Sequence, residues 1–300
     1  YYGNPSAVAG SNINQLPLVN GLQGYWKLNE SSGNAADNSV NSNTLTNNNT
    51  TTYTTGQFAN SASFASASSQ SLSIADASQT GLDNMSALTL AFWINPTTLA
   101  DNSKIIGKDS TNGNCSYNMS YHLNGDVSFT SCSGGFYGTG ISTTSTATGF
   151  ISSSTWTHIV VTSQNGVAKI YKNGAEQTSG SFPVTDSSSA IANTSSAFGL
   201  GGFTSNGSTS YMNGKLDDVR VYSRALSGQD ISALYNNPGE AYLSASSTEQ
   251  TVSLDSEVAG PSPTLYWEFD QGYGTNAEDA TSNGLDGTLN NTPTWQTEDQ

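Results

Sequence analysis

The chain has little charge, few basic residues and almost no cysteine. Charged residues make up 10% of its 300 residues, against roughly 25% in an average soluble protein. Lys and Arg together number 8 and Asp and Glu number 23, so the formal net charge is −15. Nucleic acids and anionic membrane surfaces are bound through Lys and Arg. This balance argues against both classes of partner, whereas a surplus of carboxylates is compatible with calcium.

The sequence also lacks a long apolar run. No stretch approaches the ~18 residues of a membrane-spanning helix, so we expect no membrane insertion in this segment. The first residue is Tyr1 rather than Met, and we expect any signal peptide or anchor to lie outside it. Gly, Ser, Thr and Asn are abundant instead, which suits turns and strand surfaces more than helices.

The two cysteines flank a predicted β-hairpin. Cys115 and Cys132 enclose two alternating runs joined at Asn124-Gly125, and Asn-Gly is a strong signal for a hairpin turn. Because the turn would bring both cysteines together, we predict a disulfide, in keeping with a secreted or cell-surface protein. A thiolate metal site is not expected, since no His or further Cys lies near in the sequence.

Short strand signals separated by turns run through most of the chain. Residues 88–95 repeat with a period of two, which is typical of a sheet strand. One face would carry Leu88, Leu90, Phe92 and Ile94, and the other Thr89, Ala91, Trp93 and Asn95. Residues 156–163 and 166–173 form two β-rich runs around an Asn-Gly turn. One helix is predicted over 225–235, with Ser227 as its N-cap. The pattern predicts an all-β sandwich or jelly roll with one short C-terminal helix.

A motif near the start of the chain recurs near its end, and an internal repeat at wide spacing marks repeated domains. Three matched pairs define the repeat: Trp26 with Trp267, Gly33 with Gly274, and Asp37 with Asp279 after one inserted residue. Strand signals for a whole domain follow only the first copy. We therefore expect four segments: a lead-in or linker over 1–21, a complete module over 22–236, a linker over 237–263, and the truncated start of a second module over 264–300.

Five motifs, in this order, carry a resemblance to a known family. They are residues 24–33 (Gly-Tyr-Trp-Lys-Leu-Asn-Glu-Ser-Ser-Gly), 88–96 (Leu-Thr-Leu-Ala-Phe-Trp-Ile-Asn-Pro), 156–162 (Trp-Thr-His-Ile-Val-Val-Thr), 169–174 (Lys-Ile-Tyr-Lys-Asn-Gly) and 213–227, which begins Asn-Gly-Lys-Leu-Asp-Asp. Together they resemble the laminin-G-like, concanavalin A-like jelly-roll domain of bacterial surface proteins. The resemblance implies a β-sandwich over roughly residues 22–236. The family includes glycan binders, adhesion modules, enzyme-appended domains and spacers.

The resemblance also implies a structural calcium between the opening loop and the closing strand. The predicted ligands are Asn29, Glu30 and Asp37 in the loop and Asp217 in the strand, since calcium accepts carboxylate and amide oxygens. A buried Asp217 would need a partner, which is either this calcium or the backbone N–H groups of a loop.

Alternation along the closing strand makes a further prediction about its two adjacent aspartates. Asp217 should share a face with Val219 and Val221, and Asp218 should lie beside Arg220, which would pair with it.

Catalysis is not expected. The sequence has neither the Glu-x-Asp-x-x-Glu pattern of concanavalin A-like glucanases nor a Gly-x-Ser-x-Gly nucleophile elbow. Phe136 and Tyr137 are the predicted ligand-binding residues, because they lie in a Gly-flanked loop, and loops on a rigid sandwich commonly carry binding residues. Most of Trp26, Trp93 and Trp156 are expected in the core, because each lies in a predicted strand.

These observations favour an extracellular, non-catalytic adhesion or glycan-binding module, stabilised by calcium, whose partner is a glycan or a surface protein. The alternative is a structural repeat or a subunit of a cell-surface filament. In that case the C-terminal half-repeat would pair with a neighbouring copy, because an open sheet edge is ready to accept a strand.

Overall fold

The computed structural model describes residues 18–109, 115–133, 141–185, 190–205 and 208–236, and, near the C-terminus, residues 276–277, 279, 283–288 and 290. The chain divides into two compact units, Tyr1–Ala245 and Ser246–Gln300, and each is described by itself. Within the described ranges no helix is long and apolar enough to cross a membrane. The predicted residues Phe136 and Tyr137 lie outside these ranges, as do residues 1–17 of the predicted lead-in, the whole predicted linker and most of the predicted second module.

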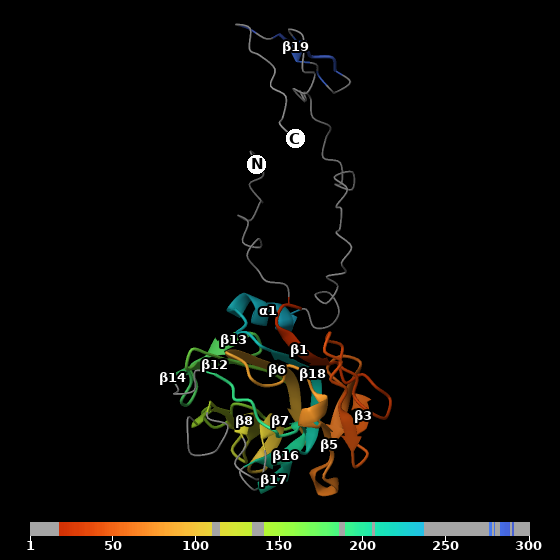
Figure 1. Ribbon diagram of the computed structural model, residues 1–300, viewed down its shortest axis with the longest axis vertical. Coiled ribbons are helices and arrows are strands. Elements are labelled where there is room, and N and C mark those ends of the chain that lie inside the picture. The colour runs from red at the N-terminus through yellow and green to blue at the C-terminus, as the bar shows by residue number, and fades with distance from the viewer. Residues whose placement is uncertain are drawn as a thin grey trace. The chain divides into compact units, whose positions relative to one another are not determined.

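The first unit is a sandwich of two antiparallel sheets (Figure 1). The nine-stranded sheet contains, in spatial order, β13 (Ala175–Gln177), β12 (Val167–Lys172), β11 (Thr157–Gln164), β6 (Ala87–Pro96), β18 (Gly214–Tyr222), β4 (Asn60–Phe64) and β3 (Thr52–Thr55), with β1 (Leu22–Trp26) beside β18 and β14 (Val184–Thr185) beside β12. The seven-stranded sheet contains β10 (Ile141–Ser145), β9 (Val127–Cys132), β8 (Cys115–Tyr121), β7 (Ser103–Asp109), β15 (Phe198–Leu200), β5 (Ser71–Ile74) and β2 (Thr46–Asn48). The predicted all-β sandwich is confirmed.

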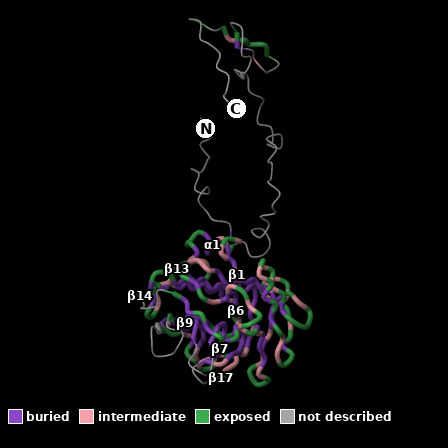
Figure 2. The backbone as a smooth tube through the Cα atoms, in the orientation of Figure 1, coloured by how far each residue is buried: buried purple, intermediate pink, exposed green. Residues whose placement is uncertain are grey.

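Period-two alternation builds the interior of the sandwich. Leu90 and Phe92 of β6 face the core, and Tyr117 and Met119 of β8 meet them from the other sheet. Facing sheets fill the space between them with interdigitated side chains in this way, and the buried layer runs through the middle of the unit (Figure 2). Trp26 is fully buried in this core, as predicted, and its indole N–H donates to the carbonyl of Asn43 at 2.9 Å.

The helix α1 (Gly228–Asn236) lies on the outer side of the nine-stranded sheet (Figure 1). Its Ile231 and Leu234 belong to a second, smaller cluster with Ala91 of β6 and Val160 of β11. Ser227 caps the helix as predicted. Its hydroxyl accepts the backbone N–H of Asp230 at 3.1 Å and its own N–H donates to the Asp230 carboxylate at 3.1 Å, which is a reciprocal capping arrangement.

The described part of the second unit is a closed turn. Its strands β19 (Asn276–Ala277) and β20 (Gly287–Thr288) pair antiparallel. Asp279 lies within the turn, and its Oδ2 accepts the backbone N–H of Leu285 at 3.0 Å.

The opening loop of the first unit closes in the same way. Ala35 pairs with Leu45 as an isolated antiparallel bridge, just as Ala277 pairs with Gly287. Asp37 Oδ2 accepts the backbone N–H of Asn43, six residues further on, at 2.7 Å. The matched aspartates of the sequence repeat therefore close turns of the same length with the same kind of hydrogen bond.

Candidate functional site

The predicted calcium ligand Asp37 holds the opening loop against β1. Its Oδ1 accepts the backbone N–H groups of Tyr25 and Ser39, both at 2.8 Å. Its Oδ2 accepts the Ser39 hydroxyl at 2.8 Å and the backbone N–H of Asn43 at 2.7 Å. Both carboxylate oxygens are thus engaged in closing the loop.

Asn29 and Glu30, which follow β1, accept hydrogen bonds from backbone N–H groups. Asn29 Oδ1 accepts the backbone N–H of Asn60 at 3.0 Å, and Glu30 Oε1 accepts that of Ala36 at 2.8 Å. Glu30 Oε2 is buried and has no hydrogen-bond partner.

Asp217 is hydrogen-bonded to backbone N–H groups of a loop, which was the predicted alternative to calcium. Its Oδ2 accepts the backbone N–H groups of Gln57 and Phe58 at 2.8 and 2.9 Å, whereas its Oδ1 is buried without a partner. No group of three or more His, Cys, Asp and Glu side chains in the described ranges is placed to hold a metal ion. Calcium stays a prediction, for which Glu30 Oε2 and Asp217 Oδ1 are the open oxygens.

The predicted alternation along β18 is wrong at Asp217. Asp217 pairs with Trp93 of β6 and Arg220 pairs with Ala91, so the register shifts between them. Asp218 has a φ of 52° and acts as the extra residue of a β-bulge, which reverses the facing of every later side chain. Asp217 therefore shares the outer face with Arg220, while Val219 and Val221 face the core. The predicted pair of Asp218 and Arg220 is confirmed at 2.9 Å.

A row of buried polar side chains crosses the outer face of the nine-stranded sheet. His158, Trp93 and Asp217 are neighbours across β11, β6 and β18, and Tyr235 of α1 stacks over Trp93 with ring centroids 5.6 Å apart. Burial raises the pKa of Asp217 to about 7, against the opposing hydrogen bonds from Phe58 and Gln57. Burial, helped by the charge of Arg220, lowers the pKa of His158 to about 3. His158, Trp93 and Asp217 are each 5% exposed or less, so this row is part of the packed interior between the nine-stranded sheet and its outer cover.

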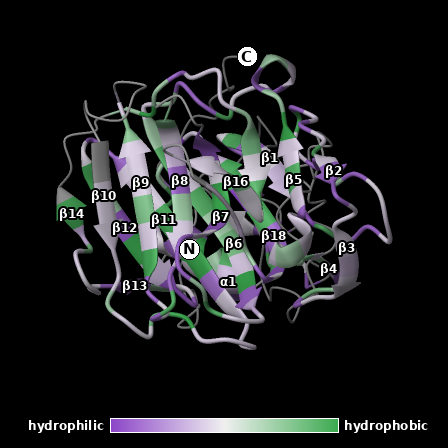
Figure 3. Cartoon of the chain, turned by 90° about the horizontal axis from the view of Figure 1, so that it is seen from below, coloured by the Kyte–Doolittle hydropathy of each residue, from purple (hydrophilic) through white to green (hydrophobic). Residues whose placement is uncertain are grey.

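A second group of polar side chains lies on the outer face of the seven-stranded sheet, which Figure 3 views from that side. Core residues alternate along its strands with hydroxyl and amide residues that point outward. Strand pairing aligns the outward residues in two rows: Lys104, Ser120, Ser128 and Ser145 in the first, and Asn118, Thr130 and Thr143 in the second. Together with Asn102, His122 and Ser205 these residues line a hollow of about 430 Å³, which we call the lysine hollow.

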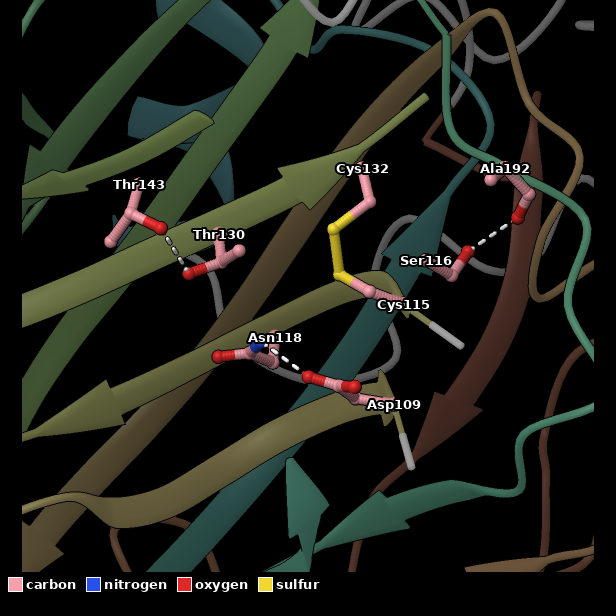
Figure 4. Close-up of a disulfide and its surroundings, with 8 residues drawn as sticks. All are labelled: Asp109, Cys115, Ser116, Asn118, Thr130, Cys132, Thr143 and Ala192. Carbon is pink, nitrogen blue, oxygen red and sulfur yellow. Dashed lines mark hydrogen bonds between the residues drawn. A yellow bond between two sulfur atoms is a disulfide. The ribbon is translucent and has the colours of Figure 1, made fainter. Parts of the chain in front are cut away.

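Hydrogen bonds between neighbouring strands organise the lysine hollow. The hydroxyls of Ser120 and Ser128 lie 2.9 Å apart, and His122 Nε2 lies 3.2 Å from the Ser128 hydroxyl. In the second row the hydroxyls of Thr130 and Thr143 lie 3.0 Å apart (Figure 4). Cross-strand pairs of this kind stabilise a sheet and also set the spacing of the hydroxyls.

The predicted disulfide joins Cys115 at the start of β8 to Cys132 at the end of β9. It lies beside the Asn118 and Thr130 row (Figure 4). Asn118 Nδ2 in turn donates to Asp109 Oδ2 at 2.8 Å. The disulfide thus ties together two of the strands that carry the lysine hollow.

A hairpin of β16 (Gly202–Ser205) and β17 (Ser208–Tyr211) lies on the same face and separates the lysine hollow from a second one. Phe203 of the hairpin sits so close to β7 that a Cβ on Gly107 would lie 2.6 Å from its ring. Glycine is therefore required at 107 for the hairpin to seat.

The second hollow has a volume of about 390 Å³, and we call it the aromatic hollow. Phe203 and the half-buried Tyr211 line it, with Asn48, Ser73 and Thr209 among its polar residues. Asn48 Nδ2 donates to the Ser73 hydroxyl at 2.8 Å.

Neither hollow was predicted from the sequence. The available signal was the alternation within residues 115–121 and 127–132, where Ser, Asn and Thr occupy every second position. That signal shows which residues point outward. It does not show that strands from distant parts of the chain place them together.

The profile described as the concanavalin A-like lectin/glucanases superfamily matches residues 64–232, more than half of the chain. No curated protein sequence matches the chain.

Solved structures with the same fold include one enzyme domain and two toxin binding domains. Domain 4 of AbnA, an extracellular arabinanase of Geobacillus stearothermophilus in complex with arabinotriose, is 21% identical with a TM-score of 0.52, over 71% of this chain and 98% of that one. The binding domain of Paraclostridial Mosquitocidal Protein 1 is 18% identical with a TM-score of 0.54, over 72% and 52%. The binding domain of botulinum neurotoxin serotype D is 14% identical with a TM-score of 0.53, over 73% and 52%.

At these identities the structural similarity shows a shared fold, and this chain spans about half the length of the two toxin domains. The family match covers the strands from β5 to β18 and the first five residues of α1. The chain therefore belongs to the concanavalin A-like lectin/glucanases superfamily.

Proposed function

We propose that the chain is an extracellular, non-catalytic glycan-binding module that binds sugar on the outer face of its seven-stranded sheet. The observation that carries this proposal is the pair of hollows beside the β16–β17 hairpin, lined with hydroxyl, amide and aromatic side chains. Ser, Thr and Asn can both donate and accept hydrogen bonds, which suits the hydroxyl groups of a sugar. An extracellular location is supported by the disulfide.

The aromatic hollow supplies the second element of sugar recognition. The ring of Tyr211 stands beside Gly202, where any Cβ would collide with it, and it is half-buried at the wall of the hollow. An aromatic face held in this way can cover the apolar C–H face of a sugar ring. The amide of Asn48 and the hydroxyl of Thr209 lie within reach of the same space.

A glycan-array screen of the full chain, followed by titration of the best glycan, tests the proposal. Replacing Tyr211 with Ala should weaken binding by about tenfold through the loss of ring contact. Tyr211→Phe keeps the ring and should bind within about threefold of the wild type. Folded protein that binds no glycan would remove the proposal, and equal binding by Tyr211→Ala would remove the aromatic hollow from it.

The same screen, run once in calcium and once in EDTA, also tests the calcium prediction. Bound calcium would use the open oxygens of Glu30 and Asp217 and tie the opening loop to β18. Binding that EDTA abolishes would support calcium, and binding that is the same in both conditions would argue against a role for it in recognition.

A structural role in a repeated array is the second candidate. It is supported by the matched turns at Asp37 and Asp279, which close with equivalent hydrogen bonds and suggest that a second module begins in the C-terminal unit. If that segment pairs with neighbouring copies, light scattering should show mass rising with protein concentration. A monomer at every concentration would leave the tandem arrangement but contradict pairing between chains.

A further inference from the structure

We propose that the lysine hollow recognises an acidic glycan, with a carboxylate or sulfate group of the sugar held against Lys104 Nζ. This inference rests on the proposed glycan-binding function and adds the class of ligand. It predicts that the hollow prefers anionic sugars although the whole chain is strongly acidic.

The first observation is the state of Lys104 itself. The residue is 4% exposed, and its Nζ donates to the neutral amide oxygen of Asn102 at 2.7 Å. The same ammonium lies 5.8 Å from the centroid of the Phe203 ring, and it forms no ion pair with any residue in the described ranges. Burial lowers the pKa of Lys104, with Asp109 acting in the opposite direction. An anionic ligand would supply the missing counter-charge.

Lys108, on the same strand, is a lysine with a structural role and provides the comparison for Lys104. It is fully buried, and its Nζ meets the carboxylates of Asp76 and Asp83 at 2.5 and 3.1 Å. It also donates to the carbonyls of Thr194 and Ser196 at 2.7 and 2.6 Å. Burying a charge is costly unless it is paired, and Lys108 meets that requirement within the protein, whereas Lys104 does not.

The second observation is the absence of carboxylates from the lining of the lysine hollow. Its described lining holds Lys104 and His122 among hydroxyl and amide residues, and no Asp or Glu, in a chain with 23 acidic and 8 basic residues. Asp109 lines the aromatic hollow instead, where its Oδ2 accepts the Asn118 amide. An ammonium in a partly dehydrated hollow attracts an anion far more strongly than one in bulk water.

The third observation is the arrangement of neutral groups around the charge. Ser120 pairs directly with Lys104 across β7 and β8. Its hydroxyl contacts the hydroxyl of Ser128, which in turn contacts the ring nitrogen Nε2 of His122. A sugar whose acidic group met Lys104 would therefore place its hydroxyls along a row of donors and acceptors. The volume of about 430 Å³ lies within the ~300–1,000 Å³ that is usual for small-ligand sites.

The test uses an array that carries uronate-containing, sialylated and sulfated glycans beside neutral ones, probed with the full chain. We expect the strongest glycans to be acidic. In titrations of the best one, Lys104→Met should weaken binding at least about tenfold, because a charge-assisted hydrogen bond is lost. Lys169→Met, which removes an exposed lysine paired with Glu176, should leave the affinity unchanged.

A change in the ligand keeps the test independent of how well Lys104→Met folds. Esterifying the carboxylate, or removing the sulfate, should weaken binding to the wild type as much as Lys104→Met does. The same change should have little further effect on the variant. Neutral glycans as the best ligands, or an undiminished preference for acidic ones in Lys104→Met, would overturn this inference and leave the proposed function standing. Binding of no glycan would overturn both.

Discussion

Replacing Arg220 with Met will destabilise the first unit by about 3–5 kcal/mol, which is the usual cost of leaving a buried charge without its partner. Arg220 is 3% exposed and lies on the outer face of the nine-stranded sheet, beneath the smaller core. Its guanidinium lies 2.9 Å from Asp218 and 4.2 Å from the centroid of the Tyr25 ring. Methionine fills similar space but leaves the Asp218 carboxylate buried and unpaired. Urea unfolding at neutral pH, followed by circular dichroism, would measure the loss.

The double variant Asp218→Asn with Arg220→Met is the matched control. It removes both charges, and Asn readily adopts the left-handed backbone that position 218 requires. We expect it to be more stable than Arg220→Met alone, because no unpaired charge remains. A double variant that is less stable than the single one, or an Arg220→Met protein as stable as the wild type, would contradict this account of the pair.

Asp217 and His158 should give the wild-type protein two opposing contributions to its pH dependence. The pKa of Asp217 rises from 3.8 to about 7 on folding, so the folded state keeps a proton that the unfolded chain has already released. Stability from this group is present below about pH 4 and is lost as the pH rises to about 7. The whole shift in the pKa of Asp217 corresponds to at most about 4 kcal/mol of the free energy of unfolding.

His158 acts in the opposite direction. Its pKa falls from 6.5 to about 3 on folding, so the unfolded chain takes up a proton that the folded state refuses. Stability from this group is therefore lost as the pH falls from about 6.5 to about 3. Between about pH 4 and 6.5 the two contributions offset each other, and removal of either one should expose the other.

The measurement is the free energy of unfolding of Asp217→Asn and of His158→Gln, relative to the wild type, at several values between about pH 4 and pH 8. EDTA is present throughout, so that no cation can hold the carboxylate ionised. Asp217→Asn keeps an oxygen for the amides of Gln57 and Phe58, and it should gain stability relative to the wild type as the pH rises. His158→Gln should show the reverse trend. Differences from the wild type that do not change with pH would refute both assignments.

Local signals in the sequence were sufficient for the class of fold. Strict alternation predicted the strand that became β6, Asn-Gly turns predicted the hairpins, and Ser227 predicted the cap of α1. Each of these features depends on residues that are close in the sequence, which is why they could be predicted from the sequence alone. The cysteine pair is of the same kind, because one hairpin turn brings Cys115 and Cys132 together.

Predictions that needed longer-range knowledge were less successful. The face assigned to Asp217 was wrong because a bulge at Asp218 interrupts the alternation, and nothing in the local pattern marks that bulge. Phe136 and Tyr137 remain predictions outside the described residues. The two hollows went unnoticed because strand order in a sheet depends on the packing of the whole unit.

The sequence by itself determined that this chain is an all-β, disulfide-bonded and acidic protein, because composition, alternation and turn residues act over short distances. Only the tertiary structure decided what its polar residues do. Lys104 and Lys108 are four residues apart in β7 and would share a face in a regular strand. A register shift between Lys104 and Ile106 sends Lys108 inward to two carboxylates and Lys104 outward into a hollow whose described lining holds no Asp or Glu. No local pattern encodes the packing between distant strands, which gave Lys108 two carboxylate partners and gave Lys104 none among the described residues.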